Sequence, residues 1–236
     1  MLAKTKACYP APEAILCASV EAMQVDFDTA MRVEARYFTG LVTGAVAKNI
    51  IGTFWFQANH IKNGGDRPKG VPAAKFQKVG ILGAGMMGAG IAWAQASRGI
   101  ATVLKDVSTE KAEAGKAYSA KLTQARVDKG RMTAEAQQAL LARITPTASA
   151  ADLAGCDLII EAVFENRDLK AKVTQEAEPQ LAPGGFFASN TSTLPISGLA
   201  TASSRPEKFV GIHFFSPVDK MKLVEIIRGK QTDDET

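Results

Sequence analysis

The stretch Val79-Gly-Ile-Leu-Gly83-Ala-Gly85-Met-Met-Gly88 decides the fold of this 236-residue protein. It begins with a short apolar run, Val79–Leu82, which has the composition of a buried strand. The pattern G-x-G-x-x-G follows at once, and residues 89–97 then have the composition of a closely packed helix. A strand that runs through such a loop into a helix is the first half of a dinucleotide-binding βαβ unit.

Each glycine of the loop is expected to have its own task. Gly83 permits the tight turn from strand to helix, Gly85 lets a pyrophosphate approach the backbone, and Gly88 lets the helix lie close to the strand. The free N–H groups at the start of the helix, around Met86 and Met87, then face the phosphates. The glycine pattern alone is a weak signal, so its context has to support it.

An acidic residue follows the loop at the spacing that a dinucleotide site requires. Asp106 lies 18 residues after Gly88, directly after the apolar stretch 101–104. Its carboxylate can accept hydrogen bonds from both adenosine ribose hydroxyls, and its charge would repel a 2′-phosphate. We therefore expect NAD and not NADP as the cofactor. The alternative is a structural glycine turn followed by a surface aspartate.

From Lys78 onward, short apolar stretches alternate with helical ones. Strands are expected at 79–82, 101–104, 158–160, 186–188, 209–215 and 223–227. Helices are expected at 89–97, 108–129, 133–143 and 169–178. Strands that alternate with helices form βαβ crossovers, so the sequence predicts an α/β fold of the Rossmann type, with a doubly wound and mainly parallel sheet.

The first third of the chain has a different character. Residues 1–62 read as helices: Pro10-Ala-Pro-Glu13 is a helix start, Asp26 and Asp28 can cap a second helix, and Thr43-Gly44 breaks it before a third. These helices carry more apolar surface than an isolated helical pair can cover, so we expect them to pack on something else. Residues 63–77 are rich in Gly and Pro and are interpreted as a linker.

Composition excludes several classes of protein. The formal charge of +4 comes from basic residues spread along the chain, which does not indicate nucleic-acid binding. The three cysteines, Cys8, Cys17 and Cys156, have no disulfide or metal-ligand spacing, which favours a reducing compartment. No apolar run approaches the ~20 residues of a membrane span.

A histidine and a glutamate late in the chain are the strongest candidates for acid–base chemistry. The sequence has only two histidines, and His60 precedes the linker, where a surface or interface role is expected. His213 lies on an expected strand, and Glu225 interrupts the next one. If the two strands fold back about residue 219, the midpoint, the carboxylate faces the imidazole and can set its tautomer. The alternative is a buried structural ion pair.

Several motifs together resemble those of 3-hydroxyacyl-CoA dehydrogenases. They are Gly83–Gly88, Asp106, Glu161-Ala-Val-Phe-Glu165, Ser189-Asn-Thr-Ser192, Gly211-Ile-His-Phe-Phe-Ser-Pro217 and Lys222-Leu-Val-Glu225. The resemblance covers residues 78–230. Residues 1–62 further resemble the linker helices of the multifunctional β-oxidation α subunit, which follow an enoyl-CoA hydratase domain and pack against it.

The resemblance implies a role for each candidate residue. His213 would remove the 3-hydroxyl proton of a 3-hydroxyacyl-CoA as hydride passes from C3 to NAD. Glu225 would orient His213, and Ser192 would bind the substrate oxygen. Five residues would line the cofactor site: Glu161, Val163, Glu165, Lys170 and Asn190. The polar segment 108–143 would lie near CoA, whose phosphates could meet Lys121, Arg126 and Lys129.

The family has parts that this sequence does not contain. An all-helical C-terminal domain completes the substrate pocket, and multifunctional members also carry a hydratase domain and can bind a thiolase subunit. The sequence therefore resembles the central piece of a larger enzyme, expected to bind NAD but to be weakly active or inactive alone. The resemblance places such an enzyme in the bacterial cytoplasm or, alternatively, in mitochondria or peroxisomes.

Two other interpretations remain open. The first is a non-catalytic NAD-binding module, although binding alone requires none of His213, Glu225 and Ser192. The second is another Rossmann dehydrogenase, of the 6-phosphogluconate type. Such enzymes depend on a catalytic lysine in a later helix and favour NADP, which Asp106 disfavours. Titration with both cofactors separates the family prediction from this second alternative.

Overall fold

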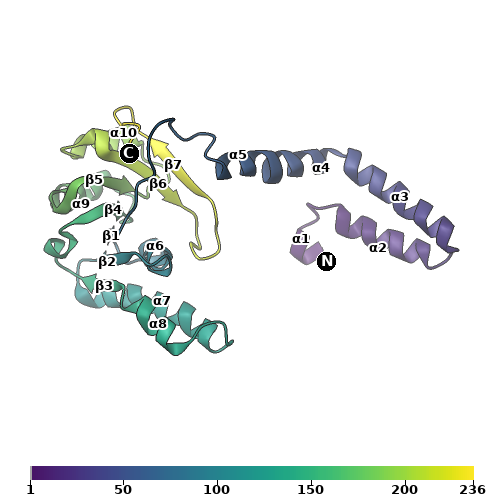
Figure 1. Ribbon diagram of the computed structural model, residues 1–236, viewed down its shortest axis with the longest axis horizontal. Helices are drawn as coiled ribbons and strands as arrows, with labels where there is room; N and C mark the ends of the chain where they lie inside the picture. Colours follow the sequence, from purple (N-terminus) through teal and green to yellow (C-terminus); the bar gives the residue numbers. More distant parts are fainter. Residues whose placement is uncertain (1) are drawn as a thin grey trace. The chain divides into compact units, whose positions relative to one another are not determined.

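The computed structural model describes residues 2–236, which form two compact units, unit 1 up to Lys69 and unit 2 from Gly70 to Thr236. The regular elements described in unit 1 are all helices (Figure 1). Its helices are α1 (Leu2–Thr5), α2 (Ala11–Ala22), α3 (Phe27–Thr43), α4 (Ala45–Ile50) and α5 (Ala58–Lys62), with a π-helical segment, Ile51–Gln57, between the last two. The helical segment predicted before residue 78 is thus confirmed.

Local sequence signals set the helix ends of unit 1. The Asp26 side chain accepts a hydrogen bond from Thr29 N at 3.0 Å and caps α3, as predicted, while Asp28 lies in the first turn. Helices α2 and α3 contact each other through the Glu21 carboxylate, which accepts hydrogen bonds from Arg36 and from the Tyr37 hydroxyl. Helices α2 to α5 bury no side chain among the described residues.

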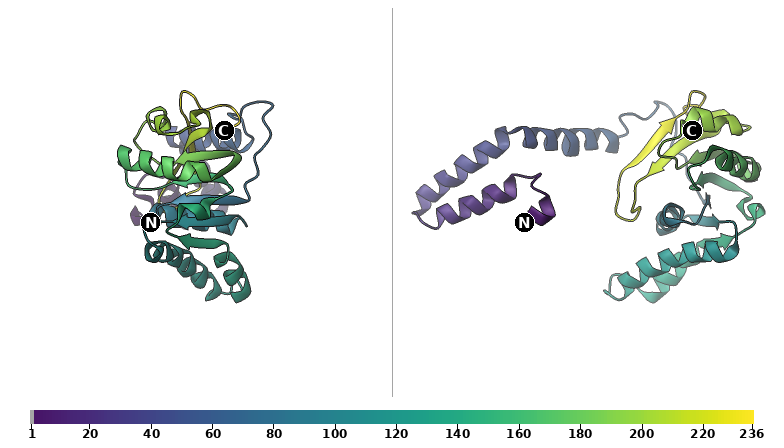
Figure 2. Two further views of the ribbon diagram at one scale, coloured as in Figure 1. Left: turned by 90° about the vertical axis from the view of Figure 1, so that its left-hand side faces the viewer. Right: turned by 180° about the vertical axis from the view of Figure 1, so that it is seen from behind.

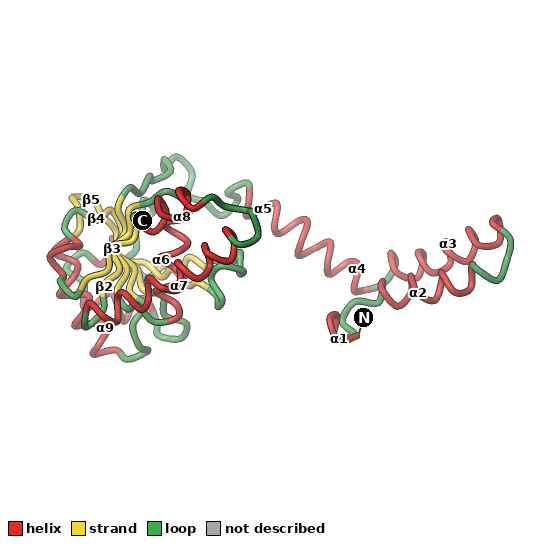
Figure 3. The backbone as a smooth tube through the Cα atoms, turned by 90° about the horizontal axis from the view of Figure 1, so that it is seen from below, coloured by secondary structure: helices red, strands yellow, loops and turns green. Residues whose placement is uncertain are grey.

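Unit 2 contains a seven-stranded sheet with the order β3-β2-β1-β4-β5-β6-β7. The strands are β1 (Lys78–Leu82), β2 (Ala101–Lys105), β3 (Ile144–Thr147), β4 (Cys156–Glu161), β5 (Leu181–Ser189), β6 (Phe209–Phe214) and β7 (Val224–Arg228). All neighbouring pairs are parallel except β6 and β7. This confirms the predicted Rossmann-type, mainly parallel sheet. Figure 3 shows its strands side by side.

The helices of unit 2 complete the crossovers between the strands. They are α6 (Met86–Ser97), α7 (Thr109–Val127), α8 (Ala134–Leu141), α9 (Arg167–Ala177) and α10 (Ile196–Leu199), with short 3₁₀ turns at Ala150–Leu153, Glu178–Gln180, Ala200–Ala202 and Pro206–Lys208. Ser108, Thr133 and Asn166 cap α7, α8 and α9 with their side-chain oxygens. None of the helices in residues 2–236 combines the length and apolar character that a membrane crossing needs.

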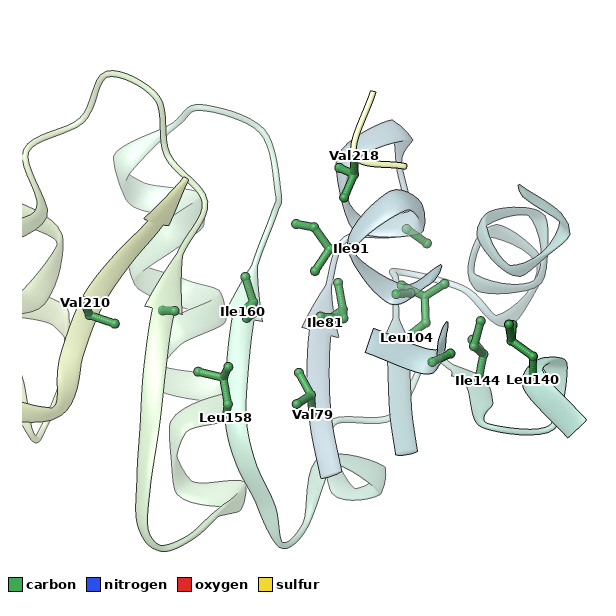
Figure 4. Packing of buried hydrophobic residues seen from close by; sticks show 14 residues of the cluster. Val79, Ile81, Ile91, Leu104, Leu140, Ile144, Leu158, Ile160, Val210 and Val218 are labelled. Carbon is green, nitrogen blue, oxygen red and sulfur yellow. The ribbon is translucent and has the colours of Figure 1, made fainter. Parts of the chain in front are cut away.

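The sheet separates two apolar clusters because successive strand residues point to opposite faces. One cluster joins Val79 and Ile81 of β1 to Ile91 of α6, as Figure 4 shows. The other joins Leu82 of the same strand to Ala177 of α9 and to other residues. Burial on both faces explains why the strand reads as one apolar run and not as an alternating one. Each such aliphatic side chain contributes roughly 1.5–3 kcal/mol.

Two element predictions need correction. Helix α6 begins at Met86 and not at residue 89, because the loop's last three residues already form the first helical turn, with Gly85 at the N-cap position. Strand β3 was not predicted. Its sequence, Ile-Thr-Pro-Thr, is short and contains Pro146, which a strand tolerates at the edge of a sheet. It pairs only with β2.

Candidate active site

The loop after β1 requires glycine at two of its positions for different reasons. Gly83 has φ +91°, and a Cβ there would lie 2.8 Å from the carbonyl oxygen of Ala162. At Gly88, a Cβ would lie 1.7 Å from the carbonyl oxygen of Gly83, so α6 could not stay so close to the strand. Gly85 differs, because a Cβ there would meet nothing within 4 Å. Its surroundings are open space, which a bound group can occupy.

Asp106 is tied to the loop. It follows β2, and its Oδ2 accepts a hydrogen bond from the backbone N–H of Ala84 at 2.7 Å. Its Oδ1 accepts one from the backbone N–H of Val107, also at 2.7 Å. Each carboxylate oxygen has a second lone pair, so Asp106 can still accept hydrogen bonds from a ligand. The structure thus places Asp106 beside the glycine loop, at the carboxyl ends of β1 and β2.

A cavity of about 680 Å³ lies at these strand ends. Its walls come from the loop, from residues after β2 and β4, and from α7 and α9. Of the predicted cofactor residues it is lined by Gly83, Gly85, Met86, Met87, Asp106 and Val163. Sequence reasoning missed the apolar wall formed by Val107, Phe164, Leu169 and Val173. Val107 and Phe164 come soon after expected strands, and Leu169 and Val173 are spaced four residues apart on the expected helix 169–178.

Two of the predicted cofactor residues form an ion pair in the interior. Lys170 Nζ lies 2.9 Å from both carboxylate oxygens of Glu161, and the two side chains are 2% and 1% exposed. The Ser189 hydroxyl also donates to Glu161. Glu161 and Lys170 do not line the cavity. Both side chains are buried, and the Ser189–Glu161 hydrogen bond joins the ends of β4 and β5, so the structure supports a role in holding these strand ends together.

Glu165 organises the loop that follows β5. Its Oε1 accepts hydrogen bonds from the Thr191 hydroxyl, from Ser192 N at 3.1 Å and from Thr193 N at 3.2 Å, while its Oε2 lies 3.2 Å from Lys170 Nζ. Burial opposes ionisation, but these hydrogen bonds and the lysine charge outweigh it and lower the pKa of Glu165 to about 2. The loop that carries Ser192 is therefore held by an ionised carboxylate.

His213 and Glu225 face each other across the antiparallel pair of β6 and β7. His213 Nδ1 lies 2.8 Å from Glu225 Oε2, which confirms the predicted fold-back about residue 219. An ionised carboxylate can only accept, so Nδ1 is the donor in this pair, which leaves Nε2 as the acceptor of the neutral imidazole. The ring of Phe215 lies beside the imidazole, with centroids 4.6 Å apart. This geometry is that of an oriented general base.

Asn190 joins the loop after β5 to the strand of His213. Its side-chain Oδ1 accepts a hydrogen bond from Phe214 N at 2.8 Å, and its backbone N–H donates to the Glu161 carbonyl at 2.8 Å. Through its side chain and its backbone, Asn190 thus links the ends of three neighbouring strands, β4, β5 and β6. The structure brings the Ser192 loop and the His213 strand to one edge of the sheet, the edge that also carries the glycine loop.

The contacts of CoA phosphates with Lys121, Arg126 and Lys129 remain predictions. Arg126 lies over the Trp93 ring, with its Cζ 5.1 Å from the centroid. Lys121 and Lys129 are exposed on or just after α7. Nothing in residues 2–236 forms a cluster of metal ligands.

Comparison with known proteins also indicates a dinucleotide-binding domain in unit 2. Residues 78–236 match the family described as "3-hydroxyacyl-CoA dehydrogenase, NAD binding domain". The structure is similar to (S)-3-hydroxybutyryl-CoA dehydrogenase from Ralstonia eutropha, with 41% identity and a TM-score of 0.65 over 68% of this chain and 56% of that one. It is also similar to 3-hydroxybutyryl-CoA dehydrogenase from Escherichia coli, with 34% identity and a TM-score of 0.65 over 68% of this chain and 34% of that one.

A further similar structure is the dehydrogenase part of multifunctional enzyme 1 from C. elegans. Identity is 28% and the TM-score 0.62, over 72% of this chain and 39% of that one. The part of each relative that this chain covers ranges from about a third to somewhat over half of the relative's length.

Proposed function

The chain belongs to the 3-hydroxyacyl-CoA dehydrogenase family, and from this premise we propose that it takes part in the NAD-dependent oxidation of (S)-3-hydroxyacyl-CoA to 3-oxoacyl-CoA. The proposal places it in fatty-acid β-oxidation, as the central piece of a multifunctional enzyme. One observation carries the catalytic part: His213 and Glu225 form a 2.8 Å pair at the sheet edge that also holds the glycine loop.

The residues around the loop fit the adenosine and pyrophosphate portions of NAD. Open space surrounds Gly85, where a pyrophosphate would approach the backbone N–H groups at the start of α6. Asp106 lines the cavity and has lone pairs free for ribose hydroxyls. Its charge disfavours the 2′-phosphate of NADP. When bound, NAD supplies the acceptor for the hydride that leaves C3 of the substrate.

The side chains of this chain would perform the proton transfer. His213 Nε2 accepts the proton of the 3-hydroxyl group as that carbon becomes a carbonyl. Glu225 keeps the other proton on Nδ1 and stabilises the imidazolium that results. The Ser192 hydroxyl donates a hydrogen bond to the substrate oxygen, from a loop whose backbone is held by Glu165.

The multifunctional setting has narrower support. It comes from the resemblance of residues 1–62 to linker helices and from the similarity to the dehydrogenase part of a multifunctional enzyme. In this proposal an enoyl-CoA hydratase domain, a helical C-terminal domain and a thiolase subunit are the partners. The substrate pocket is then shared with the helical domain, so the chain alone is expected to bind NAD while turning over weakly.

Calorimetric titration with NAD and NADP and an assay of NADH formation from (S)-3-hydroxybutyryl-CoA test the proposal. We expect NAD to bind at least about tenfold more tightly than NADP, the scale of one charge-assisted hydrogen bond. His213→Gln should leave NAD affinity within about twofold and reduce any turnover at least about 100-fold, as expected for loss of a general base.

Three outcomes would contradict parts of this proposal. Equal affinity for NADP would favour another Rossmann dehydrogenase of the 6-phosphogluconate type. Unchanged turnover in His213→Gln would show that His213 is not the base, and the His213–Glu225 pair would then no longer argue against a non-catalytic NAD-binding module. Turnover by the 236-residue chain at the rate of a complete family member would show that it needs no shared pocket.

A further inference from the structure

The turn between β6 and β7, residues 215–223, contacts helices that lie far from it in the sheet order. Strand β6 is separated from β1 by β4 and β5, yet its turn lies beside α6, the helix that follows β1 (Figure 1 and the reversed view in Figure 2). Three contacts make this connection. They join Ser216 to Met86, Val218 to Gly90, and Asp219 to Tyr118 of α7.

The apolar contact allows a very close approach. Val218 is 9% exposed, and a Cβ added to Gly90 would lie 2.9 Å from Val218 Cβ. Figure 4 shows Val218 next to α6, near Ile91. Beside it, the Ser216 hydroxyl lies 3.6 Å from the sulfur of Met86, a weak hydrogen bond. These two contacts hold the turn on α6 without a strong directional bond.

The directional bond comes from α7. The Tyr118 hydroxyl donates to Asp219 Oδ1 at 2.8 Å, across 101 residues of sequence. Burial and then the neighbouring Asp219 carboxylate raise the pKa of Tyr118 to about 12, so the phenol keeps its proton at neutral pH. Helix α7 also lines the cofactor cavity through Lys111 and Ala114. The bond therefore links the cofactor-binding half of the sheet to the turn.

The first half of strand β7, which carries Glu225, has few contacts besides the ladder to β6, whereas Ile227 at its other end packs against the second apolar cluster. It is an edge strand that pairs only with β6, and Val224, Glu225 and Ile226 are all exposed. The Glu225 side chain is 51% exposed, so packing does not determine its position. The ladder to β6 and the turn are what keep Glu225 opposite His213. A turn that shifted would let the strand slip or fray, as edge strands do.

We propose that Tyr118 and Asp219 are positioning residues: their hydrogen bond holds the 215–223 turn on the cofactor-binding helices and thereby keeps Glu225 on His213. The catalytic role of the His213–Glu225 pair rests on the proposed function, but the geometry of this pair can be measured without an activity assay. Tyr118 and Asp219 touch neither the imidazole nor the carboxylate of the pair directly, so their effect passes through the backbone of the turn and β7.

Nitrogen-15 NMR of the 236-residue chain tests this inference, because the chain contains only two histidines and His213→Gln assigns the signal. In the wild type the His213 proton is expected on Nδ1, protected from water by Glu225. Tyr118→Phe and Asp219→Ala should each speed exchange of this proton about fivefold, the factor that the loss of one ordinary hydrogen bond represents. In both variants, the fraction of the His213 ring in the Nε2–H tautomer should also rise.

Matched variants separate this role from a general loss of stability. Tyr37→Phe removes a hydroxyl with a carboxylate partner in unit 1 and should leave the His213 signal unchanged. Asp219→Asn keeps an acceptor oxygen and should restore most of the protection. The double variant Tyr118→Phe with Asp219→Ala should behave like either single variant, because both remove the same bond.

Two results would overturn the inference: wild-type exchange in both Tyr118→Phe and Asp219→Ala, or an equal change in Tyr37→Phe. NAD affinity, measured in parallel, should stay within about twofold of wild type. Failure of the wild-type chain to bind NAD would refute the proposed function instead, and the proton exchange of His213 would still decide the positioning role.

Discussion

Glu165 shows how one carboxylate can organise a site without lying in the cavity. It accepts four hydrogen bonds through Oε1 from the consecutive residues 191–193, and its Oε2 lies 3.2 Å from Lys170 Nζ. Lys170 in turn is held by the buried Glu161. A buried charge without a partner would be costly, so the three residues stabilise one another. Ser192 receives its position from this network.

The low pKa of Glu165 predicts an acid-dependent stability. The folded value, about 2, lies below the ordinary 4.5, so this contribution is complete above pH 4.5 and is lost as the pH falls toward 2. Glu165→Gln should lower the stability at neutral pH by about 1–2 kcal/mol, the scale of hydrogen bonds to a partly exposed charge. It should also flatten the pH dependence below pH 4.5.

Urea unfolding followed by circular dichroism over this pH range measures both effects. Glu113→Gln, at an exposed position of α7, is the matched control and should follow the wild-type curve. A Glu165→Gln curve parallel to that of the wild type between pH 4.5 and 2 would contradict the assignment.

At the scale of elements, the first strand, its loop and α6 form a unit in which position decides what each glycine does. The backbone needs Gly83 for its positive φ and Gly88 for the close approach of helix and strand. Gly85, in contrast, faces open space. The same residue type thus serves the fold at two positions and, in the proposed function, leaves room for the ligand at a third.

A pair of alanine variants separates these tasks. Gly88→Ala places a Cβ 1.7 Å from a backbone oxygen, so we expect a loss of at least about 3 kcal/mol of stability or no folded protein. Gly85→Ala has room and should melt within a few degrees of the wild type, but its methyl group occupies the space of the pyrophosphate. Its NAD affinity should fall at least about tenfold.

Thermal melting tests the prediction for Gly88→Ala, and calorimetry with NAD tests the prediction for Gly85→Ala. The prediction for Gly88 fails if its alanine variant melts with the wild type. Wild-type NAD affinity in Gly85→Ala would mean that no ligand approaches the backbone there.

At the scale of the whole molecule, the two units differ in how they are stabilised. Unit 2 has two apolar clusters separated by its sheet. Unit 1 has exposed side chains such as Phe27, Phe38 and Trp55, and its helices α2 to α5 contain no buried residue among those described. Helices without a buried face have little to maintain them in water.

Dividing the chain should therefore give one folded and one unfolded fragment. Residues 70–236 contain the clusters and the cavity lining, so this fragment should keep its fold and bind NAD within about twofold of the full chain. Residues 1–69 alone should lose most of their helicity. Circular dichroism of both fragments and calorimetry of the larger one measure this; a more than tenfold loss of NAD affinity would show that unit 1 supports the site.

Much of this protein follows from its sequence because the signals are local. The apolar run, the three glycines and Asp106 specify a strand, a turn, a helix and a charge within 30 residues, and the structure places them as expected. Counting to a midpoint was enough to pair His213 with Glu225, because an antiparallel hairpin relates residues symmetrically about its turn.

Only the tertiary structure decided the rest. Glu161 and Glu165 stand four residues apart, yet one is buried with Lys170 and the other holds the Ser192 loop. The edge strand β3 and the Tyr118–Asp219 bond were not expected either. Local periodicity shows which face of an element is apolar, but contacts across 9 to 101 residues depend on how the elements pack, and packing is a property of the whole fold.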